Sequence, residues 1–236
     1  MENRELRLQP RLQCLADHVP LGAMLSDVGT DHGYLPVYLL QHGKISRAIA
    51  SDINAAPLEH ARKTAEAYGI SLDLRLCAGL DGISPEETDT VVMAGMGSET
   101  IITILQNAMW DWRGHTLLLQ PMTKAELLRR YLTEYGFRIA GEHLVLDKGT
   151  IYPILIVKVG ESEPISGAEA WCGISLLHDP LYGDYAGDRV RKLERAAEGL
   201  RRAKALDTAQ IKALEADAAA LRDKIKEWEN ANRKGN

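Results

Sequence analysis

Short apolar runs alternate with longer amphipathic segments over roughly the first two thirds of the chain. The apolar runs are five to nine residues long and are bounded by glycine, proline and polar residues, which is typical of buried strands. Within the longer segments, apolar residues recur every three or four positions, which predicts helices. The predicted strands cover residues 23–28, 48–52, 72–76, 89–94, 116–120, 138–146 and 151–159.

Predicted helices of about ten residues precede the first strand and separate most of the others. They cover residues 10–19, 34–41, 57–67, 99–108 and 124–135. Such crossovers join parallel strands, whereas the turn at residues 147–149 is too short for one, so the final strand must run antiparallel. The fold class is therefore α/β: a Rossmann-like, seven-stranded sheet with one antiparallel strand, covered by helices on both faces.

The last third of the chain has a different pattern. Residues 160–168 have linker composition and residues 174–185 show no regular period. Two helical runs follow, at residues 190–200 and 211–228, and Asp207 with Gln210 has the spacing of a helix start between them. We expect a helical hairpin packed as an antiparallel coiled coil, with a single continuous long helix as the alternative.

This pattern divides the chain into two predicted parts. Residues 1–160 form a Rossmann-like domain, and residues 161–236 form a linker and a coiled-coil domain. No run of about 18 apolar residues and no secretory signal occur, so we expect a soluble, cytoplasmic protein with no membrane contact. The three cysteines are far apart and odd in number, which indicates neither a disulfide framework nor a metal site.

Charge is distributed unevenly between the two ends of the chain. Residues 186–236 hold 13 basic and 9 acidic residues, whereas residues 1–185 hold 15 basic and 24 acidic ones. A basic tail on an acidic protein fits contact with a polyanion, and it also fits a solvated helix of mixed charge. Charge alone leaves both open.

The strongest candidate for chemistry is the stretch from Leu25 to Tyr34. Its apolar run ends in Asp27, and Gly29 and Gly33 follow where the predicted strand turns into a helix. The next strand ends in Asp52, 23 positions after Gly29. An acid at about this separation reaches the ribose hydroxyls in nucleotide-binding α/β folds, so we expect a nucleotide-like cofactor here.

The acids in this turn bear on which cofactor binds. A dinucleotide site carries Gly-x-Gly-x-x-Gly for the pyrophosphate, and the carboxylates of Asp27 and Asp31 would repel that group. The same carboxylates attract the sulfonium and ammonium groups of S-adenosyl-L-methionine. The electrostatics therefore favour a methyltransferase over a dehydrogenase.

Several motifs together resemble the bacterial tRNA (adenine(22)-N(1))-methyltransferase family. They are Asp27-Val-Gly-Thr-Asp-His-Gly-Tyr-Leu-Pro36, Ser51-Asp-Ile-Asn54, Gly79-Leu80, Ala94-Gly-Met-Gly97 and Leu119-Gln-Pro121, followed by the coiled coil. The resemblance implies a class I methyltransferase fold, S-adenosyl-L-methionine as donor, and N1 of adenine 22 in the D-arm region of tRNA as acceptor. Two alternatives stay open: another RNA or a small molecule as acceptor, or an inactive, cofactor-sensing RNA-binding protein.

The chain departs from the family pattern at two positions. Family members usually read Gly-Asp-Gly-Leu where this chain has Cys77-Ala-Gly-Leu80, so a carboxylate expected near the cofactor adenine is missing at Ala78. Family members also commonly read Ala-Gly-Met-Gly-Gly, and this chain has Ser98 in place of the last glycine. Asp81 is the nearest acid, but it lies three positions from the expected place.

The predicted cofactor-binding residues gather after the first, second, third and fourth strands. They are Asp27, Gly29, Thr30, His32, Gly33, Asp52, Ile53, Asn54, Ala78, Gly79 and Ala94. Asp31, Gly95 and Met96 are the catalytic candidates: the carboxylate would stabilise the cationic product, and the glycine turn would let backbone carbonyls approach the adenine. No metal is expected.

Substrate contacts should come from the end of the fifth strand and from basic residues. N1 lies on the Watson–Crick edge of adenine, so the target base must be exposed or flipped. Phosphates call for Lys and Arg. The substrate-binding candidates are Gln120, Pro121, Arg7, Arg11, Arg189, Arg191, Lys192 and Arg195. Asp179-Pro-Leu-Tyr182 resembles an adenine-methylation motif, but it lies beyond the closing strands, so we expect a structural linker there. We also expect the protein to be a monomer.

Overall fold

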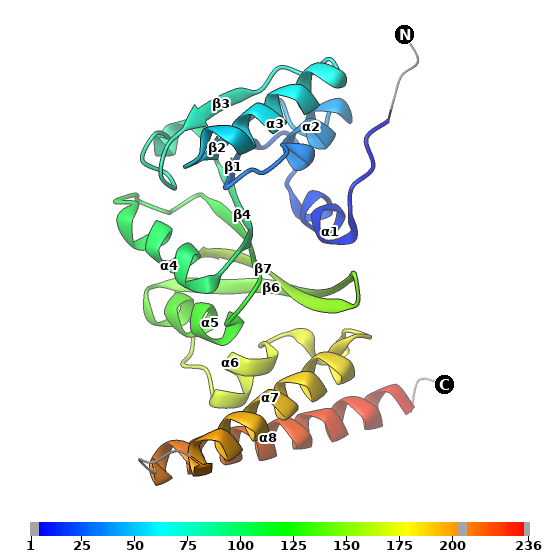
Figure 1. The fold of residues 1–236 in the computed structure, drawn as a ribbon, viewed down its shortest axis with the longest axis vertical. Helices are drawn as coiled ribbons and strands as arrows, with labels where there is room; N and C mark the ends of the chain where they lie inside the picture. Colours follow the sequence, from blue (N-terminus) through cyan, green and yellow to red (C-terminus); the bar gives the residue numbers. More distant parts are fainter. Residues whose placement is uncertain (1–4, 203–206, 234–236) are drawn as a thin grey trace.

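The computed structural model describes residues 5–202 and 207–233, and seven strands in it form one sheet (Figure 1). The sheet order is β3-β2-β1-β4-β5-β7-β6. The strands are β1 (Met24–Val28), β2 (Arg47–Asp52), β3 (Asp73–Leu76), β4 (Thr90–Met96), β5 (Thr116–Pro121), β6 (Phe137–Asp147) and β7 (Thr150–Val159). All neighbours from β3 to β5 pair in parallel, and β7 pairs antiparallel with both β5 and β6. The predicted sheet with one reversed strand is confirmed.

The position of β7 inside the sheet follows from its composition. Ile154, Leu155 and Val157 of β7 are fully buried, because β7 lies between two strands and both faces of the sheet are covered there. In β6, at the edge, buried residues alternate with partly or fully exposed ones. The apolar strand therefore takes the inner position, although it comes last in the sequence.

Helices cover the two faces of the sheet, as the periodicity predicts. They are α1 (Pro10–His18), α2 (Tyr34–Gln41) and α3 (Ala55–Ala67) on one face, and α4 (Ser98–Asn107) and α5 (Ala125–Glu134) on the other; a short 3-10 turn, η1 (Pro85–Glu87), precedes β4. One apolar cluster joins the sheet to α4 and α5, and a second joins it to α1 and α2. Asn54 stands at the N-cap of α3, although its side chain makes no capping hydrogen bond.

The segment expected to be a linker and then irregular contains more structure than predicted. It holds α6 (Gly167–Cys172), η2 (Leu176–His178) and the first turns of α7 (Tyr182–Arg202). A capping box starts α6: the Ser166 hydroxyl accepts from the Glu169 amide, and the Glu169 carboxylate accepts from the Ser166 amide. α7 begins early because Tyr182 and Tyr185 are buried. The expectation of irregular structure up to residue 185 was wrong.

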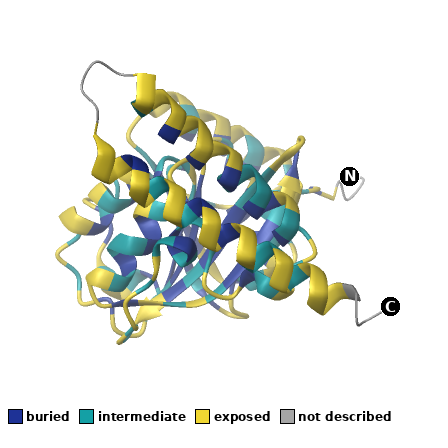
Figure 2. Cartoon of the chain, turned by 90° about the horizontal axis from the view of Figure 1, so that it is seen from below, coloured by how far each residue is buried: buried dark blue, intermediate teal, exposed yellow. Residues whose placement is uncertain are grey.

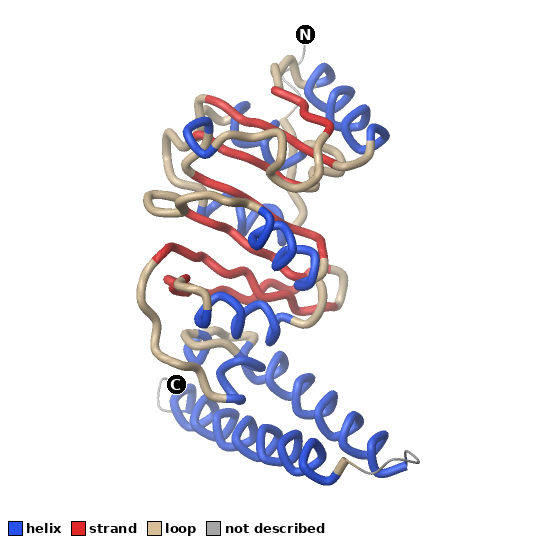
Figure 3. The backbone as a smooth tube through the Cα atoms, turned by 90° about the vertical axis from the view of Figure 1, so that its left-hand side faces the viewer, coloured by secondary structure: helices blue, strands red, loops and turns tan. Residues whose placement is uncertain are grey.

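The two long helices, α7 and α8 (Thr208–Arg233), lie side by side beneath the sheet (Figures 1 and 3). Arg222 pairs with Glu194 and Arg201 pairs with Glu215, so the residue numbers of the partners on α8 decrease as those on α7 increase. The helices therefore run antiparallel, which confirms the hairpin and excludes one continuous helix. Asp207 accepts a hydrogen bond from the Gln210 amide at 2.9 Å, as a helix start requires. Figure 2 shows exposed residues over much of the outer surface of the molecule on this side.

The C-terminal helices share a core with the sheet. A third apolar cluster joins Leu144 of β6 to Tyr185 and Leu193 of α7 and Leu221 of α8, and so crosses the boundary expected at residue 160. Arg129 of α5 and Glu142 of β6 form an ion pair there at 2.7 Å, with both side chains fully buried. No helix among the described residues combines the length and the apolar character needed to cross a membrane.

Candidate active site

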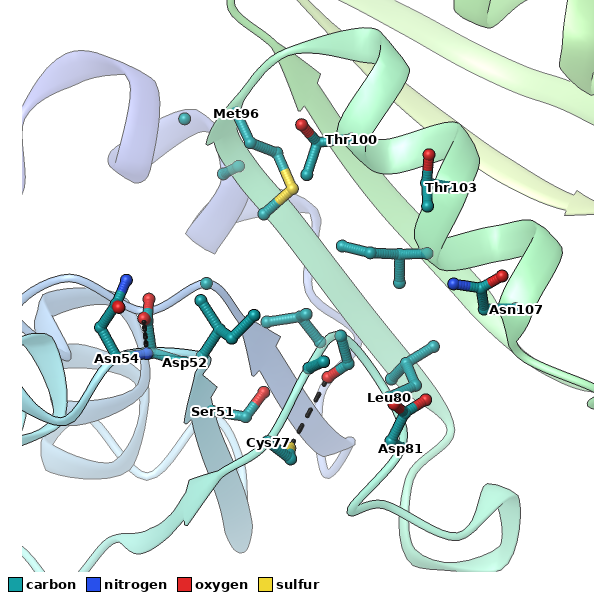
Figure 4. Close-up of a pocket in the computed structure, with 18 of the residues that line it drawn as sticks. Ser51, Asp52, Asn54, Cys77, Leu80, Asp81, Met96, Thr100, Thr103 and Asn107 are labelled. Atoms are coloured by element: carbon teal, nitrogen blue, oxygen red, sulfur yellow. Dashed lines mark hydrogen bonds between the residues drawn. The ribbon is translucent and has the colours of Figure 1, made fainter.

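A cavity of about 570 Å³ opens where β1, β2 and β4 end (Figure 4). Nine of the residues predicted from the sequence line it. They are Gly29, Asp52, Ile53, Asn54, Ala78, Gly79, Ala94, Gly95 and Met96. We call this cavity the cofactor pocket. Its place at the carboxyl ends of parallel strands is where open α/β sheets bind ligands.

The turn after β1 brings backbone close to the pocket. The amides of Gly29 and Thr30 both donate to the carbonyl of Ser51, at 2.8 and 2.9 Å, which ties the turn to β2. Gly29 has φ +77°, and a β-carbon there would lie 2.6 Å from Cε of Met96. The positive φ favours glycine, and any larger residue would also push the flexible end of the Met96 side chain aside.

Asp27 and Thr30 stabilise the turn by a hydrogen bond between their side chains, and neither residue lines the pocket. Asp27 is buried, and the Thr30 hydroxyl donates to its carboxylate at 2.7 Å. Burial raises the pKa of Asp27 to about 6, and the hydrogen bond from Thr30 offsets part of that rise. Their role as direct cofactor contacts remains a prediction.

Asp31, His32 and Gly33 also lie outside the lining of the pocket. The Asp31 side chain is 75% exposed, and the His32 ring stacks between the rings of Tyr34 and His60, at 5.1 and 4.8 Å. Candidate ligand atoms of Asp31, His32 and His60 lie within 4.8 Å of one another, so these three could hold a metal ion. The cluster is largely open to solvent and includes no fourth ligand among the residues that the structure describes, and the absence of a metal remains an expectation.

Asp52, the predicted ribose-binding acid, and its neighbour Ile53 line the pocket. The Asp52 carboxylate accepts from the Asn54 amide at 2.7 Å, which fixes its orientation. Ile53 is apolar yet 68% exposed, and it lines the pocket. An exposed apolar side chain at this place is suited to cover a flat, partly apolar ligand.

One wall of the pocket was missed from the sequence. Thr100, Thr103, Ile104 and Asn107 share one face of α4 and line the cavity (Figure 4). Their spacing of three, one and three was a usable signal, because it marks one side of the helix that follows the Gly95 turn. The other unpredicted lining residues are Val28, Ser51, Cys77, Leu80, Asp81 and Glu99.

Gly95 interrupts the pairing of β4 with β5. The register shifts between Ala94 and Met96, and Gly95 has φ +79°. Its amide donates to Oε1 of Gln120 at 3.1 Å, while Nε2 of Gln120 donates to the carbonyl of Pro121 at 3.1 Å. Gln120 is fully buried, so its side chain supports the Gly95 turn. Its predicted contact with substrate remains untested and would require breaking these bonds.

Arg11 is likewise engaged within the protein. Its guanidinium donates to Oε1 of Gln120 at 2.8 Å and to the buried carboxylate of Asp147 at 2.7 Å, and it lies over the Tyr152 ring. The sequence presented Arg11 as a surface cation for phosphate. The structure places it against the strand ends instead, because Asp147 needs a buried counter-charge.

A second cavity of about 790 Å³ lies between the end of β5 and α7, and we call it the hairpin cleft. Pro121, Arg189, Arg191 and Lys192, all predicted substrate contacts, line it. Met96, which lines the cofactor pocket, pairs with Pro121 across the sheet. One strand pair therefore separates the two cavities.

The basic residues near this cleft differ in how free they are. Arg189 is 15% exposed and lies over the Tyr185 ring at 4.4 Å. Asp188 pairs with Arg189, Arg191 and Lys192, although the side chains of Arg191 and Lys192 remain more than half exposed. Arg7 and Arg195 are exposed and line neither cavity.

The segment Asp179–Tyr182 has a structural role. The Asp179 carboxylate accepts from the amides of Leu144 and Leu181, at 3.0 and 2.9 Å, and its carbonyl accepts from the Trp228 indole. Tyr182 is buried where α7 begins. These contacts attach the hairpin to the sheet, and the segment lines neither cavity.

The residues of the cofactor pocket suit S-adenosyl-L-methionine. A glycine turn approaches from β1, an oriented acid stands at the end of β2, and exposed apolar side chains offer surfaces for a base. No part of this lining is a basic cluster for a pyrophosphate, since the lining residues include no Lys or Arg. The donor set therefore fits a nucleoside without phosphates.

Comparison with known proteins agrees with this geometry. Residues 8–155 match a family model described as a methyltransferase domain. The chain is 33% identical over 184 residues to the tRNA (adenine(22)-N(1))-methyltransferase of Bacillus subtilis, covering 77% of this chain and 75% of that protein.

Solved structures show the same similarity. The B. subtilis M1A22 tRNA methyltransferase TrmK superposes with a TM-score of 0.78 at 28% identity, over 95% of this chain and 99% of that one. M. capricolum TrmK, solved with the cofactor product S-adenosyl-homocysteine, gives 0.78 at 25% identity over 94% and 99%. The chain therefore belongs to the tRNA (adenine(22)-N(1))-methyltransferase family.

Proposed function

We propose that this protein transfers a methyl group from S-adenosyl-L-methionine to N1 of adenine 22 in tRNA. The observation that carries the proposal is the arrangement of two cavities on either side of the Met96–Pro121 strand pair. A donor in the cofactor pocket and an acceptor base entering from the hairpin cleft would meet at this pair. The monomer stays a prediction from the sequence, and tRNA as substrate supports a cytoplasmic location.

The donor, when bound, supplies an electrophilic methyl group on a sulfonium. The residues that would hold it are Gly29 at the turn, Asp52 at the ribose and Gly79 after β3. Met96 and the Gly95 turn would form the side of the pocket nearest the acceptor. Their contribution is positioning, because in-line transfer depends on the approach of the ring nitrogen.

The acceptor nitrogen needs no strong base. Adenine N1 has a free lone pair and carries no proton, whereas the methylated ring is a cation. A nearby carboxylate stabilises the charge that develops, and Asp31, two residues beyond Gly29 and exposed, is our candidate. The carbonyls of the Gly95 turn would accept from the exocyclic amino group of the target base.

The hairpin cleft offers cations for the tRNA backbone. Arg191 and Lys192 on α7 line it with exposed side chains, and Lys124 lines it from the N-cap of α5. Phosphate contacts of this kind set the affinity and make it depend on salt. Arg7 and Arg195 line neither cavity, and a tRNA contact for them stays a prediction from the sequence.

The proposal is tested with purified protein, labelled S-adenosyl-L-methionine and an unmodified tRNA transcript. We expect 1-methyladenosine at position 22, identified by mass spectrometry of nuclease fragments, and no product on a transcript carrying guanine there. Label at another position or on another RNA would assign a different acceptor. Cofactor binding without single-turnover transfer would indicate a sensing protein.

The hairpin cleft is tested by the double variant Arg191→Ala/Lys192→Ala. Loss of two phosphate contacts should weaken tRNA binding at every sequence and reduce the salt slope by about 1 to 2. Arg62→Ala/Lys63→Ala, on the exposed side of α3, also removes two cations and is the matched control for charge. An unchanged salt slope in the double variant would remove the cleft from the tRNA-binding surface.

A further inference from the structure

The end of β3 carries an unusual feature for a nucleoside site. Ala78 and Gly79 line the cofactor pocket directly after the strand, and neither side chain can accept a hydrogen bond. A purine with an exocyclic amino group presents a donor that needs an acceptor when it is enclosed. The acceptor for that donor must come from elsewhere in the lining.

The turn after β3 brings a carboxylate back to this place. The Asp81 amide donates to the Ala78 carbonyl at 3.0 Å, and Gly79 has φ +56°, so residues 78–81 form a tight β-turn. The first and last residues of such a turn have Cα atoms less than about 7 Å apart. Asp81 lines the pocket next to Gly79, and Figure 4 shows it on the same loop as Cys77 and Leu80. The β-turn therefore brings Asp81 close to the position of Ala78, although the two are three positions apart in the sequence.

Three carboxylates line the pocket, and two of them are engaged. Asp52 accepts from the Asn54 amide, and Glu99 pairs with Lys124 at 2.7 Å. Within residues 5–202 and 207–233, the Asp81 carboxylate has neither a hydrogen-bond nor an ion-pair partner. Asp81 is exposed and has its full acceptor capacity open to a ligand, while Asp52 keeps its proposed role at the ribose.

The surroundings of Asp81 indicate which part of the ligand lies there. Asp52 marks the ribose, as the acid at the end of the second strand does in such folds. Farther from β1, the lining turns apolar, with Ile53, Leu80 and Ile104. Apolar walls with one free carboxylate suit a flat base that carries an amino group.

We propose that the Asp81 carboxylate accepts a hydrogen bond from the 6-amino group of the cofactor adenine, and thereby selects an adenosyl over an inosyl group. This assignment rests on the proposed donor. An inosyl ligand has a carbonyl oxygen in place of the amino group, so the same carboxylate would repel it. Asp81 is thus a specificity residue of the cofactor pocket that replaces an acceptor absent from Ala78.

Calorimetry with two ligands tests the assignment: S-adenosylhomocysteine and its inosyl analogue. In Asp81→Ala, we expect adenosyl affinity to fall about tenfold and inosyl affinity to stay or rise, as for loss of one charged acceptor. A purely structural role would weaken both ligands alike, and that result would overturn the proposal. So would unchanged affinity for both.

A second variant keeps the test meaningful if the turn is disturbed. Ala78→Asp placed in the Asp81→Ala background should restore preference for the adenosyl ligand, since it returns a carboxylate to the other end of the same β-turn, which also lines the pocket. Glu86→Ala, an exposed acid outside the pocket, controls for net charge and should bind as the wild type does. If the wild-type protein binds neither ligand, the proposed donor itself is wrong, which separates that failure from an error about Asp81.

Discussion

Gln120 receives a hydrogen bond from Arg11 over 2.8 Å, although the two residues are 109 positions apart. The same oxygen of Gln120 accepts from the Gly95 amide. Arg11 is in turn held by the buried carboxylate of Asp147. The first helix of the chain therefore helps to fix the Gly95 turn, which lines the cofactor pocket.

Arg11→Ala should lower kcat about tenfold while changing the KM for tRNA much less. The variant leaves Asp147 buried without its counter-charge and removes one of the two donors to Oε1 of Gln120, so the Gly95 turn is held less firmly. Steady-state kinetics with tRNA varied separates the two constants. Lys63→Ala, which removes an exposed cation that lines neither cavity, is the control. A rise in KM alone would return Arg11 to the phosphate-binding role expected from the sequence.

Glu142→Gln should lower the free energy of unfolding by about 3 kcal/mol. The change leaves the charge of Arg129 fully buried without its partner, and breaking such a pair costs far more than the pair contributes. Urea denaturation measures the effect. Glu59→Gln removes an exposed partner of Arg62 and should leave the midpoint almost unchanged. Equal midpoints for the two variants would contradict the buried pairing.

Much of the sheet could be predicted because each strand is a local apolar run bounded by turn residues. The same holds for the Gly29 turn and Asp52, whose spacing along the chain reflects one strand–helix–strand unit. Even the missed helix α6 had a local signal, since Ser166 and Glu169 form a capping box. Local chemistry was therefore sufficient for these elements.

The rest depends on contacts between distant residues. Arg129 occupies a position in an amphipathic helix that a surface arginine also occupies, and only the fold brings it to Glu142. The place of β7 between β5 and β6 is set by burial on both faces, which the order of strands in the chain does not express. Gln120 and Arg11 were assigned to substrate for the same reason: their partners lie far along the sequence.

Asp27→Asn should make stability less dependent on pH between about 4 and 6. The pKa of Asp27 is about 6 in the folded protein and 3.8 as its ordinary value, so in this range the folded state binds more protons than the unfolded state. Stability of the wild type therefore falls as pH rises through the range, by about 3 kcal/mol in total. Asparagine keeps the acceptor for Thr30 without ionising. Thermal melts of the ligand-free protein from pH 4 to 7 measure the slope, and identical slopes would refute the assignment.

Gly29→Ala should abolish most cofactor binding, whereas Gly22→Ala should not. Both glycines have φ near +80°, so alanine strains the backbone equally, at about 1 kcal/mol. A β-carbon at Gly29 would also meet Cε of Met96, while one at Gly22 would meet nothing within 4 Å. The two variants should melt alike but differ at least tenfold in affinity for S-adenosylhomocysteine. Equal affinities would show that the turn does not approach the ligand.

The apolar cluster that joins Leu144 to Tyr185 and Leu221 has a consequence for how a tRNA would be read. A tail on a flexible tether would let phosphate contacts form at many distances from the reacting base. Here the hairpin is mounted on the sheet, so that distance is set before any RNA arrives. Because the hairpin is fixed relative to the cofactor pocket, an RNA whose shape places its phosphates at another distance from the target base would not bind productively, even if it carried the right base.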